Sequence, residues 1–155
     1  MAGTNKRVVG DDEVYEATNI VVPSGVVVIP HTGTPVNAGK QGITVAGDAA
    51  KNVLGVSAAR AVPVSLQVTS GTDADGYPVA MPFVDNELVT VYAHGVVNVT
   101  YTAVAVAYGA KLAAAANGQV RAWITADGAD AIIGVCKVVG GMSAAGGVGL
   151  MKIEV

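Results

Sequence analysis

Valine dominates this chain and is the strongest constraint on its fold. Of its 155 residues, 30 are Val and 26 are Ala, but only 5 are Leu. β-Branched side chains favour strands, because their restricted rotamers pack well against neighbours on a pleated surface. A bundle of Leu-rich helices is therefore excluded. We predict an all-β fold, a compact β-barrel or sandwich-like domain of short strands with an extended N-terminal arm.

Charged residues are scarce. Asp, Glu, Lys and Arg make up 14% of the chain, against about 25% in a typical soluble domain. Six of the charged residues fall within residues 1–16, so the remaining body is sparser still. A free surface normally carries more charge, and we therefore expect partner proteins to cover much of the exterior.

The charge balance also limits the partners and the compartment. A net charge of −3 with no basic stripe argues against nucleic acid as a partner. Residues 88–110 carry no charge, but they alternate with period two, which predicts strands and not a membrane span. The N-terminus lacks the apolar stretch of a signal peptide, so the chain is expected to be made in the cytoplasm. The single Cys136 excludes an internal disulfide, and we expect it to be a small buried side chain.

The chain is expected to begin with an arm. Residues 1–20 are polar and mixed in charge, and the hydrophobic pattern starts at Ile20. We predict an extended arm over residues 1–20 and a single β-rich domain over 21–155. The arm is either disordered when free or ordered against a neighbour, with Val8, Val9 and Tyr15 as anchors. Deletion of residues 2–18 is then expected to leave the fold intact.

Short apolar segments separated by turn residues predict the strands of the domain. Residues 26–29 form an apolar run closed by Pro30. Residues 62–68 alternate, and Pro63 makes them an edge strand or the start of a strand. Residues 70–78 are predicted to form a loop. At the C-terminus, alternation places Met151, Ile153 and Val155 inward and Lys152 and Glu154 outward.

Two segments leave alternatives open. Residues 89–101 keep their alternation across Gly95, which favours either one long bent strand or a tight hairpin. Residues 113–116 are compatible with a helical turn. However, Asn117-Gly118 follows, and Asn-Gly is a strong hairpin signal because both residues accept a positive φ. We therefore predict strand–turn–strand, with the second strand over residues 119–124.

The sequence contains a weak internal echo. Residues 43–56 (ITVAGDAAKNVLGV) are similar to residues 124–135 (ITADGADAIIGV), the second copy being two residues shorter. Each copy is expected to be a strand, a Gly/Asp turn and a second strand that ends in Gly-Val. The echo predicts two related halves, about 21–70 and 95–155, although any two β-hairpins share such features.

No group of residues has the composition of an active site. His31 and His94 lie near no nucleophile elbow or Cys partner. Asp73 and Asp75 begin a calcium-like loop, but its twelfth position is Val84 where an EF-hand needs Glu, which leaves only a looser calcium site open. Asp127 and Asp130 are expected to be turn residues.

The glycine-rich stretches 140–141 and 146–149 lack the Lys-Ser/Thr and the helix of a phosphate-binding loop, and they predict a flexible loop. Since neither the His and Asp residues nor these glycines form a recognisable site, we predict a protein that is not an enzyme, with no catalytic residue, no cofactor and no metal. The aromatic residues are scattered, and Phe83 and Trp123 are expected to be core or interface anchors.

Two longer stretches carry a family resemblance. Residues 95–123 (GVVNVTYTAVAVAYGAKLAAAANGQVRAW) and residues 126–141 (ADGADAIIGVCKVVGG) lead from a sheet of Val and Thr through a turn to a Gly-Val strand, and residues 46–61 follow the same order. This pattern resembles the capsid decoration (head-stabilising, or cement) proteins of tailed bacteriophages, particularly those of actinobacterial hosts. The resemblance spans about residues 20–155, and its motifs are stylistic and not catalytic signatures.

The resemblance implies a compact β-barrel subunit, often a homotrimer, bound to the major capsid protein on the outer surface of an icosahedral virion. Such subunits commonly sit at three-fold and quasi-three-fold positions and bind after the shell expands. The family has no catalytic residues to carry over. Two other classes stay open: another β-rich virion component, such as a tail-tube or head–tail connector subunit, and a small β-barrel ligand-binding domain.

Overall fold

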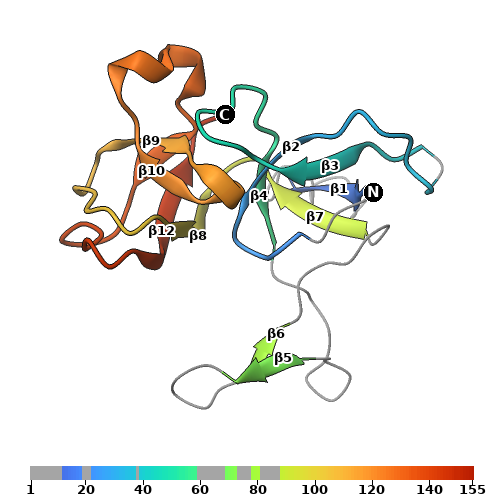
Figure 1. Ribbon diagram of the computed structural model, residues 1–155, viewed down its shortest axis with the longest axis horizontal. Helices are drawn as coiled ribbons and strands as arrows, with labels where there is room; N and C mark the ends of the chain where they lie inside the picture. The colour runs from blue at the N-terminus through green and yellow to red at the C-terminus, as the bar shows by residue number, and fades with distance from the viewer. Residues whose placement is uncertain (1–11, 19–21, 38, 59–68, 73–77, 81–87) are drawn as a thin grey trace, which may run out of the picture.

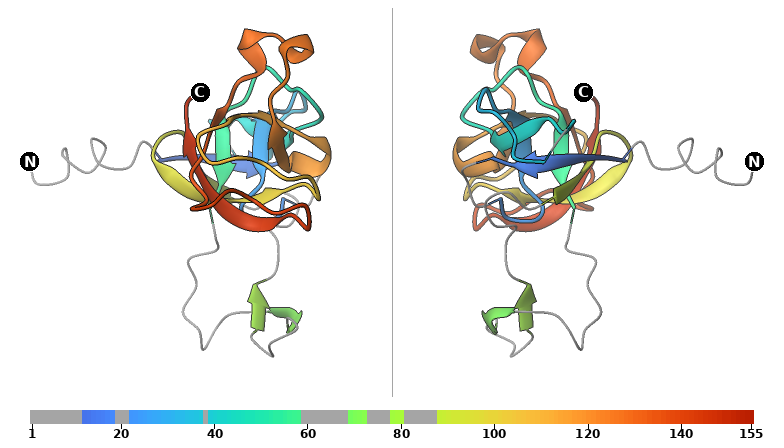
Figure 2. Two further views of the ribbon diagram at one scale, coloured as in Figure 1. Left: turned by 90° about the vertical axis from the view of Figure 1, so that its left-hand side faces the viewer. Right: turned by 90° about the vertical axis from the view of Figure 1, so that its right-hand side faces the viewer.

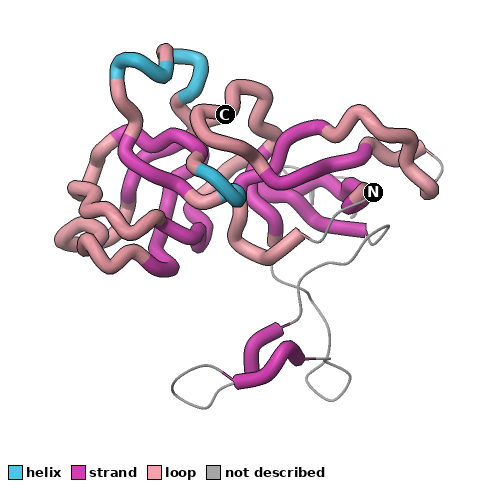
Figure 3. The backbone as a smooth tube through the Cα atoms, viewed as in Figure 1, coloured by secondary structure: helices cyan, strands magenta, loops and turns pink. Residues whose placement is uncertain are grey.

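The computed structural model describes residues 12–18, 22–37, 39–58, 69–72, 78–80 and 88–155 (Figure 1). Strands and loops account for nearly all of this part of the chain, which confirms the predicted all-β fold (Figure 3). Its helical elements are single 3₁₀ turns: η2 (Ala116–Gly118), η3 (Thr125–Asp127) and η4 (Ala129–Ala131). Ten strands close into two five-stranded barrels, so the barrel alternative holds and the sandwich alternative does not.

The first barrel has the strand order β1-β3-β2-β4-β7. Its strands are β1 (Asp12–Ala17), β2 (Val27–Pro30), β3 (Gly42–Val45), β4 (Gly55–Ser57) and β7 (Leu88–Tyr92). Between β4 and β7 the chain forms a separate two-stranded hairpin, β5 (Thr69–Thr72) and β6 (Pro78–Ala80). Figure 1 shows this hairpin below the barrels.

The second barrel has the strand order β10-β8-β12-β11-β9. Its strands are β8 (Val96–Tyr101), β9 (Lys111–Ala114), β10 (Val120–Ala122), β11 (Gly134–Cys136) and β12 (Gly147–Ile153). The two barrels lie side by side in Figure 1, and the left picture of Figure 2 looks along the pair with the second barrel in front.

Both barrels have the same topology. Numbered in chain order, the five strands of each barrel run 1-3-2-4-5 around the wall, and β7 closes on β1 as β12 closes on β8. The first and third strands pair in parallel, β1 with β3 and β8 with β10. All other neighbours within the barrels are antiparallel.

The registers of the two barrels also correspond residue by residue. The pairs Ala17–Ile43, Val28–Gly55 and Val56–Tyr92 of the first barrel match the pairs Tyr101–Val120, Leu112–Gly134 and Val135–Lys152 of the second. The connections agree as well. The amide of Gly25 donates to the Ser57 carbonyl at 2.9 Å, as that of Gly109 donates to the Cys136 carbonyl at 2.9 Å. Both glycines have a positive φ, +71° and +79°. The chain is thus a structural duplication.

This duplication corrects the details of the sequence echo. Its Gly-Val ends, Gly55-Val56 and Gly134-Val135, do fall on equivalent strands β4 and β11. Its starts do not correspond, because Ile43 in β3 matches Val120 in β10, whereas Ile124 follows β10 and leads into η3. The second copy of this segment is therefore the longer one.

The predicted domain boundaries also differ from the structure. Residues 12–17 were expected in the arm, but they form β1, which pairs with β3 and β7, and they belong to the first barrel. Residues 1–11 lie outside the described residues, as does the predicted strand 62–68. The hairpin β5–β6 occupies the ends of the predicted loop 70–78. Since β1 completes the barrel wall, deletion of residues 2–18 would open the barrel and could not leave the fold intact.

Further local expectations are settled by the structure. Residues 89–101 form neither a bent strand nor a hairpin, because β7 belongs to the first barrel, β8 to the second, and the chain crosses between them at residues 93–95. The strand–turn–strand prediction at Asn117-Gly118 is confirmed, and both residues have a positive φ, +58° and +68°. The second strand ends at Ala122 and not at residue 124.

The glycine-rich and C-terminal segments are partly as expected. Gly147 and Gly149 lie in β12 and not in a flexible loop. Met151 and Ile153 are buried and Lys152 and Glu154 are exposed, as predicted, but Val155 is 47% exposed.

Each barrel has its own apolar interior. Val28, Ile43, Val89 and Val91 pack inside the first barrel, and Tyr101, Leu112, Ile133 and Met151 pack inside the second. The second cluster continues between the barrels to Val27, Ala46 and Val56, on the outside of the first. This explains why residues 26–29 are continuously apolar: a strand buried on both faces loses its alternation.

Candidate interaction surfaces

The contact between the two barrels uses backbone as well as side chains. The Thr100 amide donates to the Gly25 carbonyl at 3.1 Å, the Gly118 amide to the Ala46 carbonyl at 2.9 Å, and the Ala49 amide to the Ala114 carbonyl at 2.9 Å. The approach at Gly118 is close, because a Cβ atom there would lie 2.8 Å from the Val27 carbonyl oxygen. The two barrels therefore meet at backbone distance.

An ion-pair network spans the same contact. The Arg121 guanidinium binds Asp127 within its own barrel at 2.8 and 2.9 Å and Asp48 of the first barrel at 2.8 Å. The hydrogen bonds from Arg121 lower the pKa of Asp127 to about 2 and also lower the pKa of Asp48. The two carboxylates in turn raise the pKa of Arg121. A second, exposed bridge joins Lys51 to Asp130 at 3.1 Å.

The duplication makes it possible to compare corresponding outer faces. We call Val27, Ala46 and Val56 of the first barrel the covered face, because the second barrel buries these residues to 0%, 1% and 1% exposure. Their counterparts in register are Lys111, Trp123 and Val135 of the second barrel, which we call the open face. The match of Ala46 with Trp123 rests on equivalent hydrogen bonds, from Ala46 to the Val27 carbonyl and from Trp123 to the Lys111 carbonyl, each 2.9 Å.

The open face is neither buried nor uniformly apolar. Lys111 is exposed, and Trp123 and Val135 are half-buried. The Trp123 indole N–H donates to the Gly128 carbonyl at 2.7 Å, and the Lys111 ammonium lies 5.7 Å from the centre of the Trp123 ring. Val135 stands between Lys111 and Lys152 on neighbouring strands, so two lysines flank an apolar side chain.

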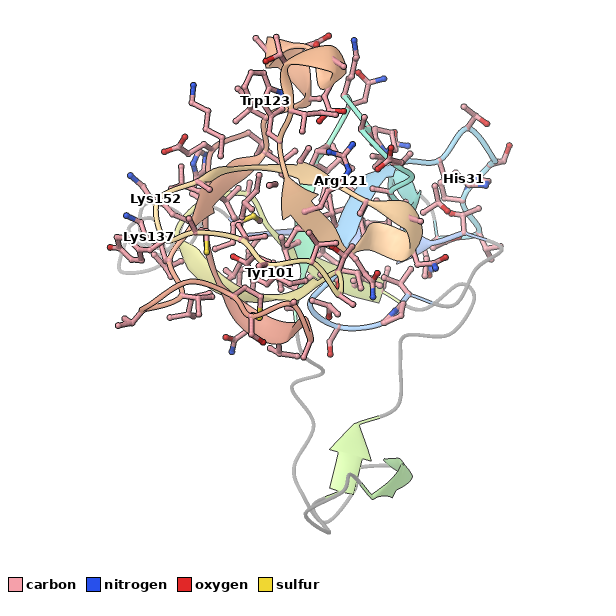
Figure 4. All side chains as sticks on the ribbon, turned by 60° about the vertical axis from the view of Figure 1, so that its left-hand side comes forward. His31, Tyr101, Arg121, Trp123, Lys137 and Lys152 are labelled. Carbon is pink, nitrogen blue, oxygen red and sulfur yellow. The ribbon has the colours of Figure 1, made fainter. Side chains whose placement is uncertain are left out.

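A second aromatic–lysine pair lies beside the open face. The Lys137 ammonium lies 5.3 Å from the ring of Tyr108, which is 56% exposed. Figure 4 shows Lys137 and Lys152 on one side of the molecule with Trp123 above them, whereas His31 lies at the opposite side. This side of the second barrel therefore combines three ammonium groups with two aromatic rings.

The first barrel carries a buried carboxylate under a loop. Glu16 on β1 is 0% exposed. Its carboxylate accepts the Val36 amide at 2.8 Å and, through Oε2, the backbone amide and the side-chain amide of Asn37 at 2.6 and 2.7 Å. Burial alone would raise the pKa of Glu16, but these hydrogen bonds favour the charged form and hold the pKa below its usual value. The loop between β2 and β3 is thereby fastened to the barrel.

The predicted interface residues have different outcomes. Val8, Val9 and Phe83 lie outside the described residues. Tyr15, expected as an arm anchor, lies on β1 and packs against the interior of the first barrel. Trp123 is on the outer wall of the second barrel and is the one of the five that the structure places on the open face.

The residues considered for catalysis or metal binding have structural contacts or positions instead. His31 Nδ1 accepts the Gly33 amide at 2.8 Å, and His94 lies exposed in the crossing between the barrels. Asp127 and Asp130 bind Arg121 and Lys51, and residues 73–77 lie outside the described residues. Cys136 is buried, as expected. Among the residues that the structure describes, no three His, Cys, Asp or Glu side chains gather in a way that could hold a metal ion.

A surface hollow lies where the barrels meet. It has a volume of about 160 Å³ and is lined by Lys51, Val53, Asp130, Ile132 and Glu154, among others. Ligand sites usually measure roughly 300–1,000 Å³, so this hollow is small for a substrate. In the described part of the chain, no helix is long and apolar enough to cross a membrane.

Sequence reasoning missed the lysine row, that is Lys111, Lys137 and Lys152 on one side of the second barrel, and the role of Glu16. The sequence contains one indication of these lysines: Lys152 alternates with Met151 and Ile153. This alternation indicates that Lys152 points outward, but it does not identify the residues beside it on neighbouring strands. Glu16 gave no signal, because burial of a carboxylate depends on the loop that covers it.

A scan against protein-family models finds no match to this chain, and a search of curated proteins finds none either.

Proposed function

We propose that this chain is a non-enzymatic capsid decoration protein of a tailed bacteriophage. In this proposal it binds the major capsid protein on the outside of the mature icosahedral head, as a trimer at three-fold and quasi-three-fold positions. There it clamps neighbouring capsomers and stabilises the expanded shell against internal DNA pressure.

The observation that carries the proposal is the apolar character of the exterior. Exposed valines occur on strands β8 and β12 of the second barrel and in two of its connections, namely Val96 (54%), Val148 (70%), Val104 (58%) and Val139 (92%). Scattered single apolar residues are normal on any surface. Together with a charged content of 14%, however, this number of them favours a surface that other proteins cover.

The area available is sufficient for such a role. The chain has an accessible surface of 8506 Å². Two self-contacts of ~800 Å² each would cover about a fifth of it, which leaves most of the exterior for a shell. A ligand that binds only the expanded shell stabilises that state by RT ln(1 + [L]/Kd), about 2.7 kcal/mol when its free concentration is 100 times Kd.

The test is co-sedimentation with expanded heads and with procapsids of the cognate phage, both lacking this protein. We expect saturable binding to expanded heads and little binding to procapsids, with a rise in the temperature at which loaded heads release their DNA. Binding to neither particle, or a protein that turns over a small molecule, would refute the proposal.

The arm is tested in the same assay with a shorter deletion than the sequence suggested. Removal of residues 2–11 keeps β1 intact, so the variant is expected to fold. Reduced occupancy on expanded heads would support a shell contact by this segment, and unchanged occupancy would refute it.

A further inference from the structure

The duplication shows how one barrel packs against another in this protein. The second barrel buries the covered face (Val27, Ala46 and Val56) of the first. The equivalent positions on the second barrel, the open face (Lys111, Trp123 and Val135), have no third barrel in the described part of the chain to bury them.

A turn beside the covered face shows the same difference. The Gly25 carbonyl accepts the Thr100 amide of the second barrel, and a Cβ on Gly25 would lie 3.3 Å from the Asn98 carbonyl oxygen. Its counterpart Gly109 has a similar positive φ, +79°, yet a Cβ there would meet nothing within 4 Å. The second barrel thus preserves the shape of a docking face that no other described barrel of the chain occupies.

The open face is more basic and more aromatic than the covered face. Lys111 replaces Val27, Trp123 replaces Ala46, and Lys152 stands beside Val135. Trp and Tyr anchor interfaces well, since they bury a large area at low entropic cost. The flanking lysines require an acidic partner, because burial of an ammonium group without a counter-charge is unfavourable.

The chain itself contains an acidic partner of suitable size. The described residues of the first barrel and its connections, 12–18, 22–37, 39–58 and 88–92, carry two Lys against four Asp and Glu, a formal charge of −2. Residues 93–155, which include the whole second barrel, carry four against three, a formal charge of +1. Opposite charges on two halves of one molecule steer copies into head-to-tail association.

We infer that the open face of the second barrel binds the first barrel of a second copy. The contact is heterologous, with the second barrel of each copy against the first barrel of the next, which is the arrangement that a closed ring of identical subunits requires. It specifies the self-contact of the trimer proposed above and rests on the proposed function to that extent.

The contact between copies is an altered form of the contact inside the chain. On the first barrel, the connection after β2 spans residues 31–41, where the second barrel has only residues 115–119, and it folds over Glu16. The open face of the second barrel and the 31–41 side of the first barrel therefore differ from the two surfaces that meet inside one chain. Because of this difference, copies do not polymerise through a repeat of the internal contact. The contact between copies instead depends on charge.

The test compares two variants of equal net charge. Lys111→Gln/Lys152→Gln removes two ammonium groups from the open face, whereas the control Ala103→Glu/Ala105→Glu adds two carboxylates at exposed positions of the β8–β9 connection. Both change the net charge from −3 to −5. Light scattering over a concentration series gives the mass of each protein against 15.4 kDa for one chain, and circular dichroism checks that all are folded.

We expect the wild type and the control to form the same oligomer, and the lysine variant to dissociate at concentrations at least tenfold higher than the wild type. Raised salt should weaken the wild-type oligomer. A wild type that is monomeric throughout, or a lysine variant indistinguishable from the control, would overturn the inference.

Head binding, measured separately, distinguishes the two proposals. If the lysine variant dissociates and no protein binds expanded heads, the self-contact stands and the decoration proposal fails. If a monomeric wild type binds expanded heads, the decoration proposal stands and the self-contact fails.

Discussion

Substitution of Gly118 by Ala tests how strongly the two barrels depend on their contact. Gly118 has φ +68°, and an added Cβ would lie 2.7 Å from Val45 Cγ1 and 2.8 Å from the Val27 carbonyl oxygen. A residue with a Cβ costs about 1–2 kcal/mol in this left-handed conformation, and overpacking a close contact costs about 1–3 kcal/mol. We therefore expect Gly118→Ala to lower the free energy of unfolding by about 2–5 kcal/mol.

A matched control separates the two contributions. Gly140 has a similar positive φ, +79°, but a Cβ there would meet nothing within 4 Å. Gly140→Ala should therefore lose only the conformational part, about 1–2 kcal/mol. The effect of Ala on the unfolded chain is the same in both variants and cancels in the comparison.

The measurement is urea unfolding, with the midpoint compared at constant m-value. Hydrogen exchange of the Ala49 amide, which donates across the contact to Ala114, gives a local readout. We expect faster exchange there in Gly118→Ala only. Equal losses of stability in the two variants would refute the view that backbone proximity joins the barrels.

Three further predictions concern the interior and the charged groups. Tyr101→Phe removes a hydrogen bond of 2.8 Å from the buried hydroxyl to a β12 carbonyl, and should cost about 0.5–1.5 kcal/mol in urea unfolding; an unchanged midpoint would contradict this. Glu16→Gln weakens the acceptors of the 31–41 loop, so amide exchange should accelerate in that loop and not in β12; uniform protection would argue against the anchor. Asp127 has its pKa lowered from 3.8 to about 2 by Arg121, so its stabilising effect is present above pH 3.8 and is lost as the pH falls towards 2. Acid titration of stability should accordingly be shallower in Asp127→Asn than in the wild type, and parallel curves would contradict the pairing.

The sequence predicts the local elements of this fold better than their partners. Valine content indicates strands, and Asn117-Gly118 indicates a turn, because both signals arise from the conformational preferences of the residues themselves. Closure into two barrels depends on pairs such as Ala17–Ile43, in which the partners are distant in the chain. No local pattern specifies such a pairing.

Strand β1 shows why the domain boundary was misplaced. Its sequence, DEVYEA, has three acidic residues among six, which is unusual for a strand and suggested an arm. The structure satisfies the one at Glu16 with three hydrogen bonds from a loop about twenty residues away. Burial of a charged group of this kind depends on tertiary partners, so it leaves no signal in the surrounding pattern.

The candidate surface was only partly accessible from the sequence. Trp123 stood out because it is the single Trp in the chain. The lysines around it lie on β9, on the connection between β11 and β12, and on β12, and only the barrel register brings them together. The sequence echo identified the equivalent strands β4 and β11, but two shared letters at one end could not align the rest.

The crossing at residues 93–95 is the only covalent connection between the first barrel, which ends at Tyr92, and the second, which begins at Val96. Cleavage of the backbone there would leave two fragments, each with all five strands of a closed barrel. The peptide link then serves mainly to hold the fragments at a high effective concentration, typically millimolar for a short tether. Fragment complementation would accordingly report the intrinsic affinity of one barrel for the other, free of that tether.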